Sequence, residues 1–332
     1  MSASFVSALG AARDAAATQQ YPVGALYVVA TPIGNLADIT LRALHVLQLA
    51  DTLACEDTRH TQALLRAYGI ERPGAQLLAL HQHNELEAAQ TVVARLQAGQ
   101  RVVYVSDAGT PGVSDPGARL AAAVRAAGLR VVPLPGASSI TAALSVAGAV
   151  AASGAHDAGG FVFAGFLPVK AAERASAVQR LAREPRCVVL LEAPHRIHEL
   201  AEALAVLGQR PVTLAREITK QFEDITTHPA EALPAWLAGA PQRSRGEFVV
   251  LLHPAPLPAE GESDAETLRV LQLLLAADLP MKSAVRLAAD ITGAPRNALY
   301  DRALALRRSA GAQGSGGTKG GKEKGSESAA AR

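Results

Sequence analysis

The chain has 332 residues, of which 49% are hydrophobic and only 4% aromatic, and a formal net charge of +2. This length allows two domains with separate cores, and no apolar run approaches the roughly 18 residues of a membrane span, which excludes a membrane-spanning protein. The basic surplus lies in the tail from Ser309 onward, so the rest is formally neutral and a nucleic-acid partner would need a local basic patch.

The N-terminus up to residue 23 has no continuous apolar stretch of the kind that a secretory signal needs, and we expect it to form a loosely ordered extension. Cys55 and Cys187 lie far apart and neither has a CxxC partner, which argues against a disulfide framework and against a zinc site. Together these features predict a soluble, cytoplasmic protein in a reducing compartment.

Residues 24–135 alternate apolar strands with amphipathic helices. The strands are expected at 25–30, 51–55, 77–80, 101–105 and 129–134, with a helix after each of them. Strands that alternate with helices of this length favour an α/β fold, in which a mostly parallel sheet is covered on both faces. We place the end of this first domain near Pro135, where its last strand stops.

A second α/β domain is expected over 136–254. Its strands are predicted at 161–164, 186–191, 212–215 and 248–253, with helices near 171–182 and 194–207. After a linker, a small helical module follows over 264–308, with helices at 267–277, 282–291 and 296–306. The Gly/Ser/Lys-rich remainder, 309–332, has the composition of a disordered tail.

Four loops of polar or small residues follow strands of the first domain, at 31–38, 56–61, 104–117 and 135–139. Open α/β sheets bind their ligands at the carboxyl ends of strands. Glycine and proline give the third loop a preset shape in which a ligand can approach the main chain, and Asp107 can accept hydrogen bonds there. The small residues of the fourth loop free backbone N–H groups at a helix start. Taken alone, the second and third loops fit a capped turn equally well.

Three charged clusters lie at strand ends of the second domain, at 192–196, 216–220 and 245–247. One cluster would be a solvated surface, but three of them, matched by four loops in the first domain, indicate a cleft between two lobes. The chain lacks a GxGxxG after its first strand, and it has no GxSxG, HExxH or GxxxxGK[ST] motif. His81 and His83 have no third ligand nearby, so no metal site is predicted.

Eight ordered blocks resemble those of the ribosomal RNA small-subunit methyltransferase I family, which has the tetrapyrrole-methylase (class III) fold. They are TPIGNLADITLRAL, ACEDTRHTQALL, YVSDAGTPGVSDPG, PLPGASSITAAL, FVFAGFLP, EAPHR, AREITKQFED and RGEFVVLL. The resemblance covers residues 26–253, and RNALYDRAL in the helical module also looks like the family. It implies two α/β lobes of the tetrapyrrole-methylase type with the cofactor cleft between them, plus a small C-terminal helical module.

The resemblance also implies an activity: transfer of a methyl group from S-adenosylmethionine to the ribose 2′-hydroxyl of a cytidine in small-subunit (16S) ribosomal RNA. Carried over motif by motif, the contacts to S-adenosylmethionine are expected from Pro32, Asp107, Ala108, Gly109, Thr110, Pro111, Ser138, Ser139, Ile140, Ala193, Ala215, Gly246 and Glu247.

Methyl transfer needs alignment of donor and hydroxyl, and a ribose hydroxyl is a weak acid that a base or a nearby cation helps to deprotonate. The candidates for this role are Glu56, Asp57, Glu192, Glu217 and Lys220, and we favour the loop with Asp57 and Arg59 together with Lys220 as the catalytic residues.

A local basic patch is expected to contact the RNA phosphates. Its predicted members are Arg59, Arg196, Arg216 and Lys220, joined in the helical module by Lys282, Arg296 and Arg302. An equally good reading is that Arg216 pairs with an interdomain partner and that the module is a packing appendage.

Two other functions stay open at this point: a tetrapyrrole or corrin-precursor methyltransferase of the same fold, and a non-catalytic RNA- or ribosome-binding relative. The EDTRHT and APHR motifs and the helical module argue against the first. The expected partner is small-subunit ribosomal RNA within the small ribosomal subunit, and the resemblance suggests a homodimer. The chain departs from the family in its N-terminal extension, in the long Gly/Ala-rich stretch 150–160 and in its basic tail.

Overall fold

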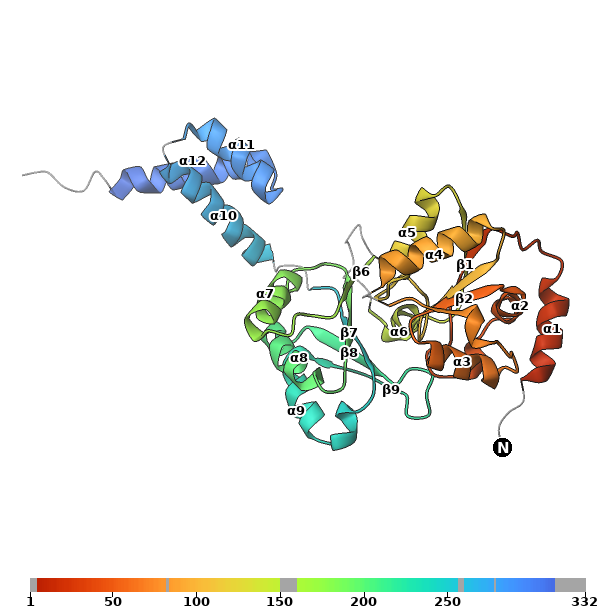
Figure 1. The fold of residues 1–332 in the computed structure, drawn as a ribbon. Coiled ribbons are helices and arrows are strands. Elements are labelled where there is room, and N and C mark those ends of the chain that lie inside the picture. Colours follow the sequence, from red (N-terminus) through yellow and green to blue (C-terminus); the bar gives the residue numbers. More distant parts are fainter. Residues whose placement is uncertain (1–4, 82–83, 150–159, 256–259, 278, 314–332) are drawn as a thin grey trace, which may run out of the picture. The chain divides into compact units, whose positions relative to one another are not determined.

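The computed structural model describes residues 5–81, 84–149, 160–255, 260–277 and 279–313. The chain forms two compact units, Met1–Pro256 and Leu257–Arg332. The larger unit contains two five-stranded sheets, each with its own helices, and we refer to these halves as the first and second lobe (Figure 1).

The sheet of the first lobe is entirely parallel. Its strands are β1 (Ala25–Val29), β2 (Thr52–Cys55), β3 (Leu77–Ala79), β4 (Val102–Val105) and β5 (Arg130–Leu134), in the order β3-β2-β4-β1-β5. All residues of β2 and β4 are buried. Continuous burial is what a parallel sheet requires when helices cover both faces, so these strands consist of unbroken apolar runs such as Val-Val-Tyr-Val.

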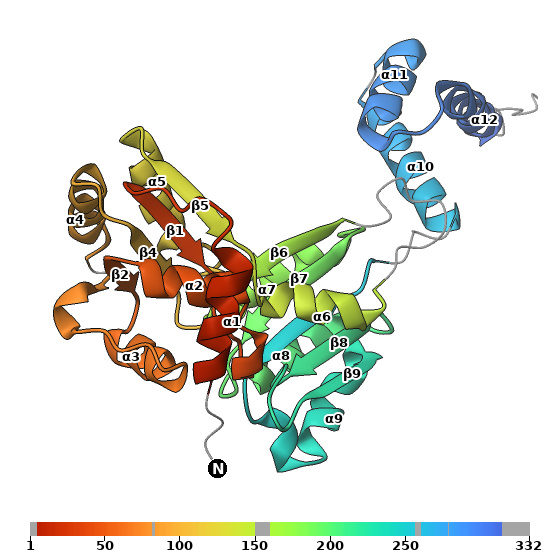
Figure 2. The same ribbon diagram turned by 90° about the vertical axis from the view of Figure 1, so that its right-hand side faces the viewer.

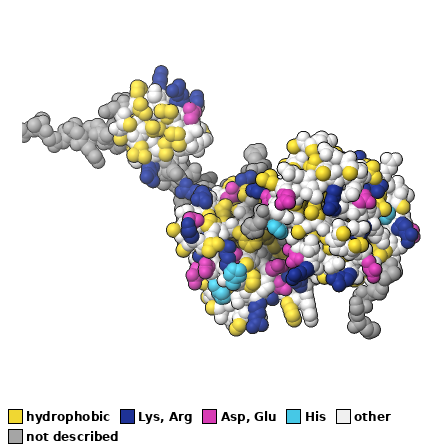
Figure 3. Space-filling view, viewed as in Figure 1, with side chains coloured by type: hydrophobic (Ala, Val, Ile, Leu, Met, Phe, Trp, Pro, Cys, Tyr) yellow, Lys and Arg dark blue, Asp and Glu magenta, His cyan; other side chains and the backbone are white. Residues whose placement is uncertain are grey.

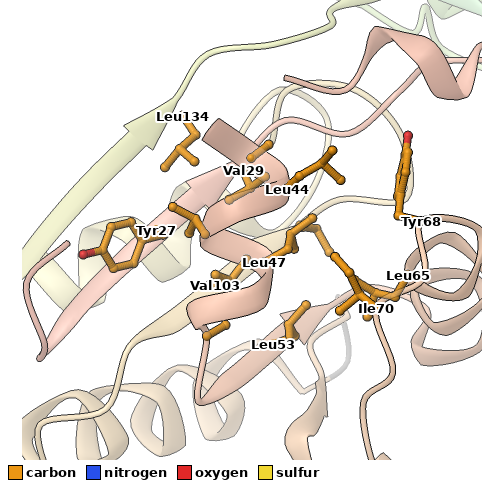
Figure 4. Packing of buried hydrophobic residues seen from close by; sticks show 14 of the residues in the cluster. Tyr27, Val29, Leu44, Leu47, Leu53, Leu65, Tyr68, Ile70, Val103 and Leu134 are labelled. Atoms are coloured by element: carbon orange, nitrogen blue, oxygen red, sulfur yellow. The ribbon is translucent and has the colours of Figure 1, made fainter. Parts of the chain in front are cut away.

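Two hydrophobic clusters cover the two faces of this sheet. On one face, α2 (Leu41–Leu49) and α3 (Thr58–Ala67) pack over β1 and β2, with Leu44, Leu47 and Leu65 fully buried (Figure 4). On the other face lie α4 (Glu85–Gln97) and α5 (Gly117–Ala126). Burial of each such leucine contributes about 1.5–3 kcal/mol, which fixes the strands whose carboxyl ends carry the loops.

The N-terminal segment is not the loose extension that we expected. Helix α1 (Val6–Ala16) packs against α2, Ala12 is fully buried, and the ring of Phe5 lies 5.3 Å from the ring of Tyr68 in an edge-on contact. The prediction was wrong for this helix because its apolar stripe consists largely of alanine, which gives a weak periodic signal in sequence.

The sheet of the second lobe is mixed. Its strands are β6 (Phe161–Gly165), β7 (Cys187–Glu192), β8 (Pro211–Arg216), β9 (Asp224–Pro229) and β10 (Phe248–Leu252), in the order β6-β7-β10-β8-β9. Only β6 and β7 are parallel, and the other neighbours are antiparallel. Strand β9 was missed in the sequence because it is a polar edge strand, in which Thr227 pairs with Thr213 through their hydroxyls at 2.7 Å.

The helices of the second lobe divide between the two faces of its sheet. Helices α7 (Ala171–Leu181), α8 (Ile197–Leu204) and α9 (Leu233–Ala238) pack on one face. Helix α6 (Ser139–Ala147), which directly follows the last strand of the first lobe, packs on the opposite face through Ile140 and Ala143 (Figure 2). The chain therefore passes from one sheet to the other between β5 and α6.

The smaller unit is a three-helix arrangement of α10 (Glu260–Ala276), α11 (Met281–Thr292) and α12 (Arg296–Gln313). Leu271, Ala288 and Leu299 are fully buried in its core, one from each helix. Gly293 ends α11 with φ +72°, a left-handed conformation that favours glycine at a helix terminus. Helix α12 continues past the expected end of the module at residue 308, while 314–332 and the stretch 150–159 lie outside the described residues.

Candidate active site

A cavity of about 300 Å³ lies between the two lobes of the larger unit, and the space-filling view shows the surface hollowed there, with acidic and basic side chains gathered beside it (Figure 3). Its volume falls at the small end of the range for pockets that bind small molecules. The cavity is lined by Ile33, Ala108, Ser139, Phe166, Leu191, Glu192, Ala193, Pro194, Ala215, Glu217, Ile218, Lys220, Glu247, Phe248 and Val249.

In the first lobe, backbone hydrogen bonds hold the loops that reach the cavity. Thr31 and Gly109 exchange two N–H···O=C bonds of 3.0 and 3.1 Å, which join the loops after β1 and β4. Gly109 has φ +81°, so glycine is the residue that fits this bridge without strain. The hydroxyl of Thr110 donates to the carbonyl of Ala137 at 2.9 Å and ties in the loop after β5.

Asp115 organises the rest of the loop after β4. Its carboxylate accepts hydrogen bonds from the N–H groups of Gly112, Val113 and Gly117 and from the Tyr104 hydroxyl. A Cβ atom on Gly117 would overlap the Tyr104 ring and the Asp115 carboxylate, so the start of α5 lies as close to the sheet as a glycine permits. The Gly/Pro-rich sequence thus produces a fixed loop.

The loop after β2 is joined to the loop after β4, but it does not reach the cavity wall. The N–H of Asp107 donates to Glu56 at 3.2 Å, and the N–H of Asp57 donates to Asp107 at 3.2 Å. The Asp57 carboxylate caps α3 by accepting from the N–H groups of Arg59 and His60, at 2.7 and 3.2 Å. These hydrogen bonds from His60 and Arg59 lower the pKa of Asp57. The described cavity lining includes neither Asp57 nor Arg59.

In the second lobe, a network of ionised groups forms part of the cavity wall. The Lys220 ammonium lies 2.9 Å from both Glu217 and Glu247, and the Glu247 N–H also donates to the Glu217 carboxylate at 2.9 Å. Burial opposes ionisation of Glu217, but the Glu247 N–H and Lys220 outweigh it and lower the pKa of Glu217. Burial likewise disfavours the Lys220 cation, yet hydrogen bonds to both carboxylates raise its pKa. Lys220 is therefore a cation at neutral pH and does not act as a proton acceptor.

The loop that carries this network has an unusual backbone. Glu217 and Thr219 have φ values of +51° and +67°, which strain residues other than glycine by about 1–3 kcal/mol each. Gly246 is required beside it, because a Cβ atom there would overlap the Glu217 side chain. The loop also contacts the first lobe, where the N–H of Asn35 donates to the Thr219 hydroxyl at 3.2 Å.

An open groove approaches Lys220 from a second direction. Its volume is about 560 Å³, and it is lined by Phe5, Gly34, Asn35, Leu36, Ala67, Thr219, Lys220 and Gln221. Lys220 therefore belongs to the linings of both the cavity and the groove.

Glu192 ends β7 and is buried in the cavity wall. One carboxylate oxygen, Oε1, accepts the N–H of Ala193 at 2.9 Å and forms an ion pair with Arg196 at 3.2 Å. Arg196 also donates to the Leu167 carbonyl at 2.6 Å, and its side chain is only 17% exposed. The structure thus places Arg196 in an internal ion pair.

Two further arginines of the predicted patch, Arg216 and Arg296, are also in ion pairs. Arg216 is largely buried and lies 3.7 Å from Asp224 of the neighbouring strand, so its ion pair lies within the second lobe and not between domains as the alternative reading had it. Arg296 belongs to the smaller unit, where it is exposed and pairs with Asp290 at 3.1 Å.

Of the expected S-adenosylmethionine contacts, Ala108, Ser139, Ala193, Ala215 and Glu247 line the cavity. The others belong to the same loops without being part of the lining: Pro32, Asp107, Gly109, Thr110, Pro111, Ser138, Ile140 and Gly246. The sequence reasoning missed the apolar lining residues Ile33, Phe166, Leu191, Pro194, Ile218, Phe248 and Val249. Phe166 had a usable signal in the sequence, because it is a large aromatic residue just after a predicted strand. In the structure its side chain is 52% exposed.

Comparison with known proteins extends over both units. Residues 25–234 match the family of Tetrapyrrole (Corrin/Porphyrin) Methylases, and residues 261–307 match the RsmI C-terminal HTH domain. A Pseudomonas aeruginosa protein named "Ribosomal RNA small subunit methyltransferase I" is 49% identical over 285 residues, which cover 85% of this chain and 97% of that protein. A protein of the same name from Escherichia coli O157:H7 is 47% identical, with 85% and 95% covered.

Among solved structures, the methyltransferase CobJ is similar with a TM-score of 0.51 and 21% sequence identity, and the match covers 69% of this chain and 94% of that one. This likeness shows the fold. The resemblance carried by the eight sequence blocks is thereby confirmed for both family and fold. No helix in the described part of the chain is both long and apolar enough to cross a membrane.

Proposed function

This chain belongs to the ribosomal RNA small subunit methyltransferase I family, and we propose that it transfers a methyl group from S-adenosylmethionine to the ribose 2′-hydroxyl of a cytidine in small-subunit ribosomal RNA. One observation carries the proposal. Every residue that lines the interlobe cavity, apart from Leu191, comes from seven of the eight family blocks. Segments far apart in the sequence are thus brought together around one small-molecule site.

The cavity fits S-adenosylmethionine in its chemistry. Ala108, Ala193 and Ala215 have short side chains that leave the main chain accessible to a ligand, and most other lining residues are apolar, as in sites that enclose a purine ring. Lys220, Glu217 and Glu247 supply charged groups of the lining. When bound, S-adenosylmethionine supplies an electrophilic methyl group. The residues that would hold it are those carried over from the family motifs.

We propose that Lys220 assists the reacting hydroxyl. It is the cation of the described cavity lining, and it also reaches the open groove of about 560 Å³, through which a polymer can approach. A cation near a hydroxyl favours loss of its proton. Lys220 therefore keeps the role of assisting cation, whereas Asp57 and Arg59, which lie outside the cavity lining, do not enter the reaction in this proposal.

The relatives' names support ribosomal RNA as the substrate, and the match of the smaller unit to a helix-turn-helix domain supports RNA contacts through Lys282 and Arg296. We further propose that the RNA is recognised within the small ribosomal subunit, that the protein works in the cytoplasm and that it forms a homodimer, as the family resemblance suggests. A tetrapyrrole methyltransferase would share this fold. A small tetrapyrrole substrate, however, would not explain the presence of a helix-turn-helix domain in the smaller unit.

The test is transfer of a radiolabelled methyl group from S-adenosylmethionine to three acceptors: small ribosomal subunits that lack the modification, the free RNA and a tetrapyrrole precursor. We expect label in the RNA of the subunits, at a cytidine whose 3′-phosphodiester becomes resistant to alkali. Label in the tetrapyrrole alone, or in none of the acceptors, would contradict the proposal. Faster labelling of free RNA than of subunits would contradict only the proposal that the RNA is recognised within the small ribosomal subunit.

A further inference from the structure

Phe166 combines two properties that no other described residue of the cavity lining shares: an aromatic ring and an exposed side chain. Four of the described lining residues are exposed, and we call them the mouth of the cavity: Ala108, Phe166, Pro194 and Glu247. Phe248, the other aromatic residue of the lining, is only 2% exposed, against 52% for Phe166. The Phe166 ring is therefore accessible to a ligand that enters the cavity from outside.

The loop that carries Phe166 is fixed although the ring is exposed. Leu167 is buried in the core of the second lobe, and its carbonyl accepts a hydrogen bond from Arg196 at 2.6 Å. Two residues further on, the Val169 carbonyl accepts from the buried Arg174 at 2.7 Å. An exposed ring forgoes the stabilisation that its burial would give, and an apolar side chain exposed in a cavity is typical of a ligand contact.

An RNA acceptor needs such a ring at the mouth. A ribose hydroxyl can enter the cavity only if its nucleotide leaves the RNA stack, and the base then loses its stacking neighbours. Proteins that bind unpaired nucleotides commonly supply an aromatic ring in place of those neighbours. None of the S-adenosylmethionine contacts expected from the sequence lies in the block FVFAGFLP, which contains Phe166. The ring is thus left for the acceptor, which as part of a polymer approaches from the open side.

We propose that the Phe166 ring stacks on the unpaired base of the acceptor nucleotide and so holds its ribose at the mouth of the cavity; this rests on the function proposed above. Every base has a flat π-face, so stacking tolerates any of them. Phe166 therefore supplies affinity for an unpaired nucleotide and fixes its position, and the choice of cytosine is made by other groups.

The test compares Phe166→Ala with the wild-type protein in methylation, over a range of concentrations of the acceptor that the wild type uses. The KM for the acceptor should rise about 5- to 100-fold, as expected for the loss of one base–aromatic stack. The kcat at saturating acceptor should change less than about threefold, because the stack is present both before and during the reaction. Binding of S-adenosylhomocysteine, measured by calorimetry, should be unchanged, which also shows that the variant is folded.

Further variants separate stacking from apolar packing. Phe166→Tyr keeps the ring and should keep the wild-type KM. Phe166→Leu keeps an apolar side chain without a ring, and should raise KM nearly as much as Phe166→Ala does. The control is Phe161→Ala, because Phe161 begins the same strand, is 46% exposed and is not part of the described cavity lining. It should leave KM unchanged.

Three results would overturn the assignment. Weaker S-adenosylhomocysteine binding by Phe166→Ala would mean that the ring contacts the cofactor. A wild-type KM for Phe166→Leu would mean that apolar packing suffices without a stack. An unchanged KM for Phe166→Ala would leave the ring without a role in acceptor binding. A wild-type protein that methylates no RNA refutes the proposed function instead, a separate outcome because it is scored before any variant is compared.

Discussion

The two walls of the cavity are built by different kinds of interaction. In the first lobe, hydrogen bonds to the backbone shape the wall: the Thr31–Gly109 bridge, the bond from the Thr110 hydroxyl and the bonds that the Asp115 carboxylate accepts. In the second lobe, ionised groups dominate: Glu192 with Arg196, and Lys220 with its two glutamates. The difference separates two tasks, since a fixed loop suits holding a ligand and positioned charged groups suit stabilising a reaction. Changes in the first wall should therefore alter binding, and changes in the second should alter the rate.

The largest effect is expected from Lys220→Met, which removes the cation of the second wall. The single-turnover rate constant should fall on the order of 100-fold, because a positioned charge near the reacting oxygen is lost, while S-adenosylhomocysteine binding should change little. Lys170→Met is the control, because Lys170 is an exposed lysine that forms an ion pair with Glu173 and is not part of the cavity lining. If the Lys220→Met rate stays within threefold of wild type, the second wall does not serve the reaction through this cation.

The next effect concerns the geometry of the first wall. Gly117→Ala places a methyl group against the Tyr104 ring and the Asp115 carboxylate, and overpacking of this kind lowers the free energy of unfolding by about 1–3 kcal/mol. We expect weaker S-adenosylhomocysteine binding in calorimetry, with the rate at saturation preserved. Gly74→Ala is a matched control, because no atom lies near its added Cβ. A fall in rate at saturation without any change in binding would reverse the roles that we assign to the two walls.

A smaller effect is expected from Thr110→Val, which keeps the side-chain shape but removes the hydrogen bond to Ala137. One such bond contributes about 1 kcal/mol, so binding of S-adenosylhomocysteine should weaken by up to about fivefold. Thr91→Val removes a comparable hydroxyl-to-backbone bond in α4, away from the cavity, and should leave binding unchanged. Equal affinities for Thr110→Val and wild type would show that the loops keep their shape without this tie.

The smallest catalytic effect is expected from Asp57→Ala, which should leave the methylation rate within twofold of wild type. The helix cap is lost, however, so the midpoint of thermal unfolding should fall at neutral pH. Because hydrogen bonds lower the pKa of folded Asp57, its stabilising effect is present above the ordinary carboxyl pKa and disappears as the pH falls through the folded value. The difference in midpoint should therefore shrink in acid. A rate loss above tenfold would return Asp57 to the reaction.

Asp57 also illustrates how far the sequence could predict the site. An acidic residue between a strand and a helix has the same pattern whether it caps the helix or faces a substrate, and only the geometry shows that it caps. Lys220 was identified as a site residue, but its pairing with Glu247 joins segments 27 residues apart and could not be inferred from spacing. The Gly/Pro loop at 104–117 was predictable as a ligand loop, because its shape depends on local residue types.

The fold was predictable to a similar extent. The parallel first sheet followed from unbroken apolar strands, whereas the mixed second sheet did not, because β9 is polar and at an edge. Helix α1 was missed because alanine contributes little contrast between the two sides of a helix. Patterns of hydrophobicity thus identified the central strands, and the peripheral elements became visible only through what they pack against.

The path of the chain between the lobes has a mechanical consequence. The segment 135–138 is tied to the first lobe by Thr110, and α6 directly after it is embedded in the core of the second lobe. A rotation of one lobe against the other must therefore be absorbed by the backbone torsions between Ala137 and Ser139, at the rim of the cavity. A ligand that fixes these torsions also fixes the interlobe angle. A ligand held against Ser139 would therefore restrain the connection between the lobes.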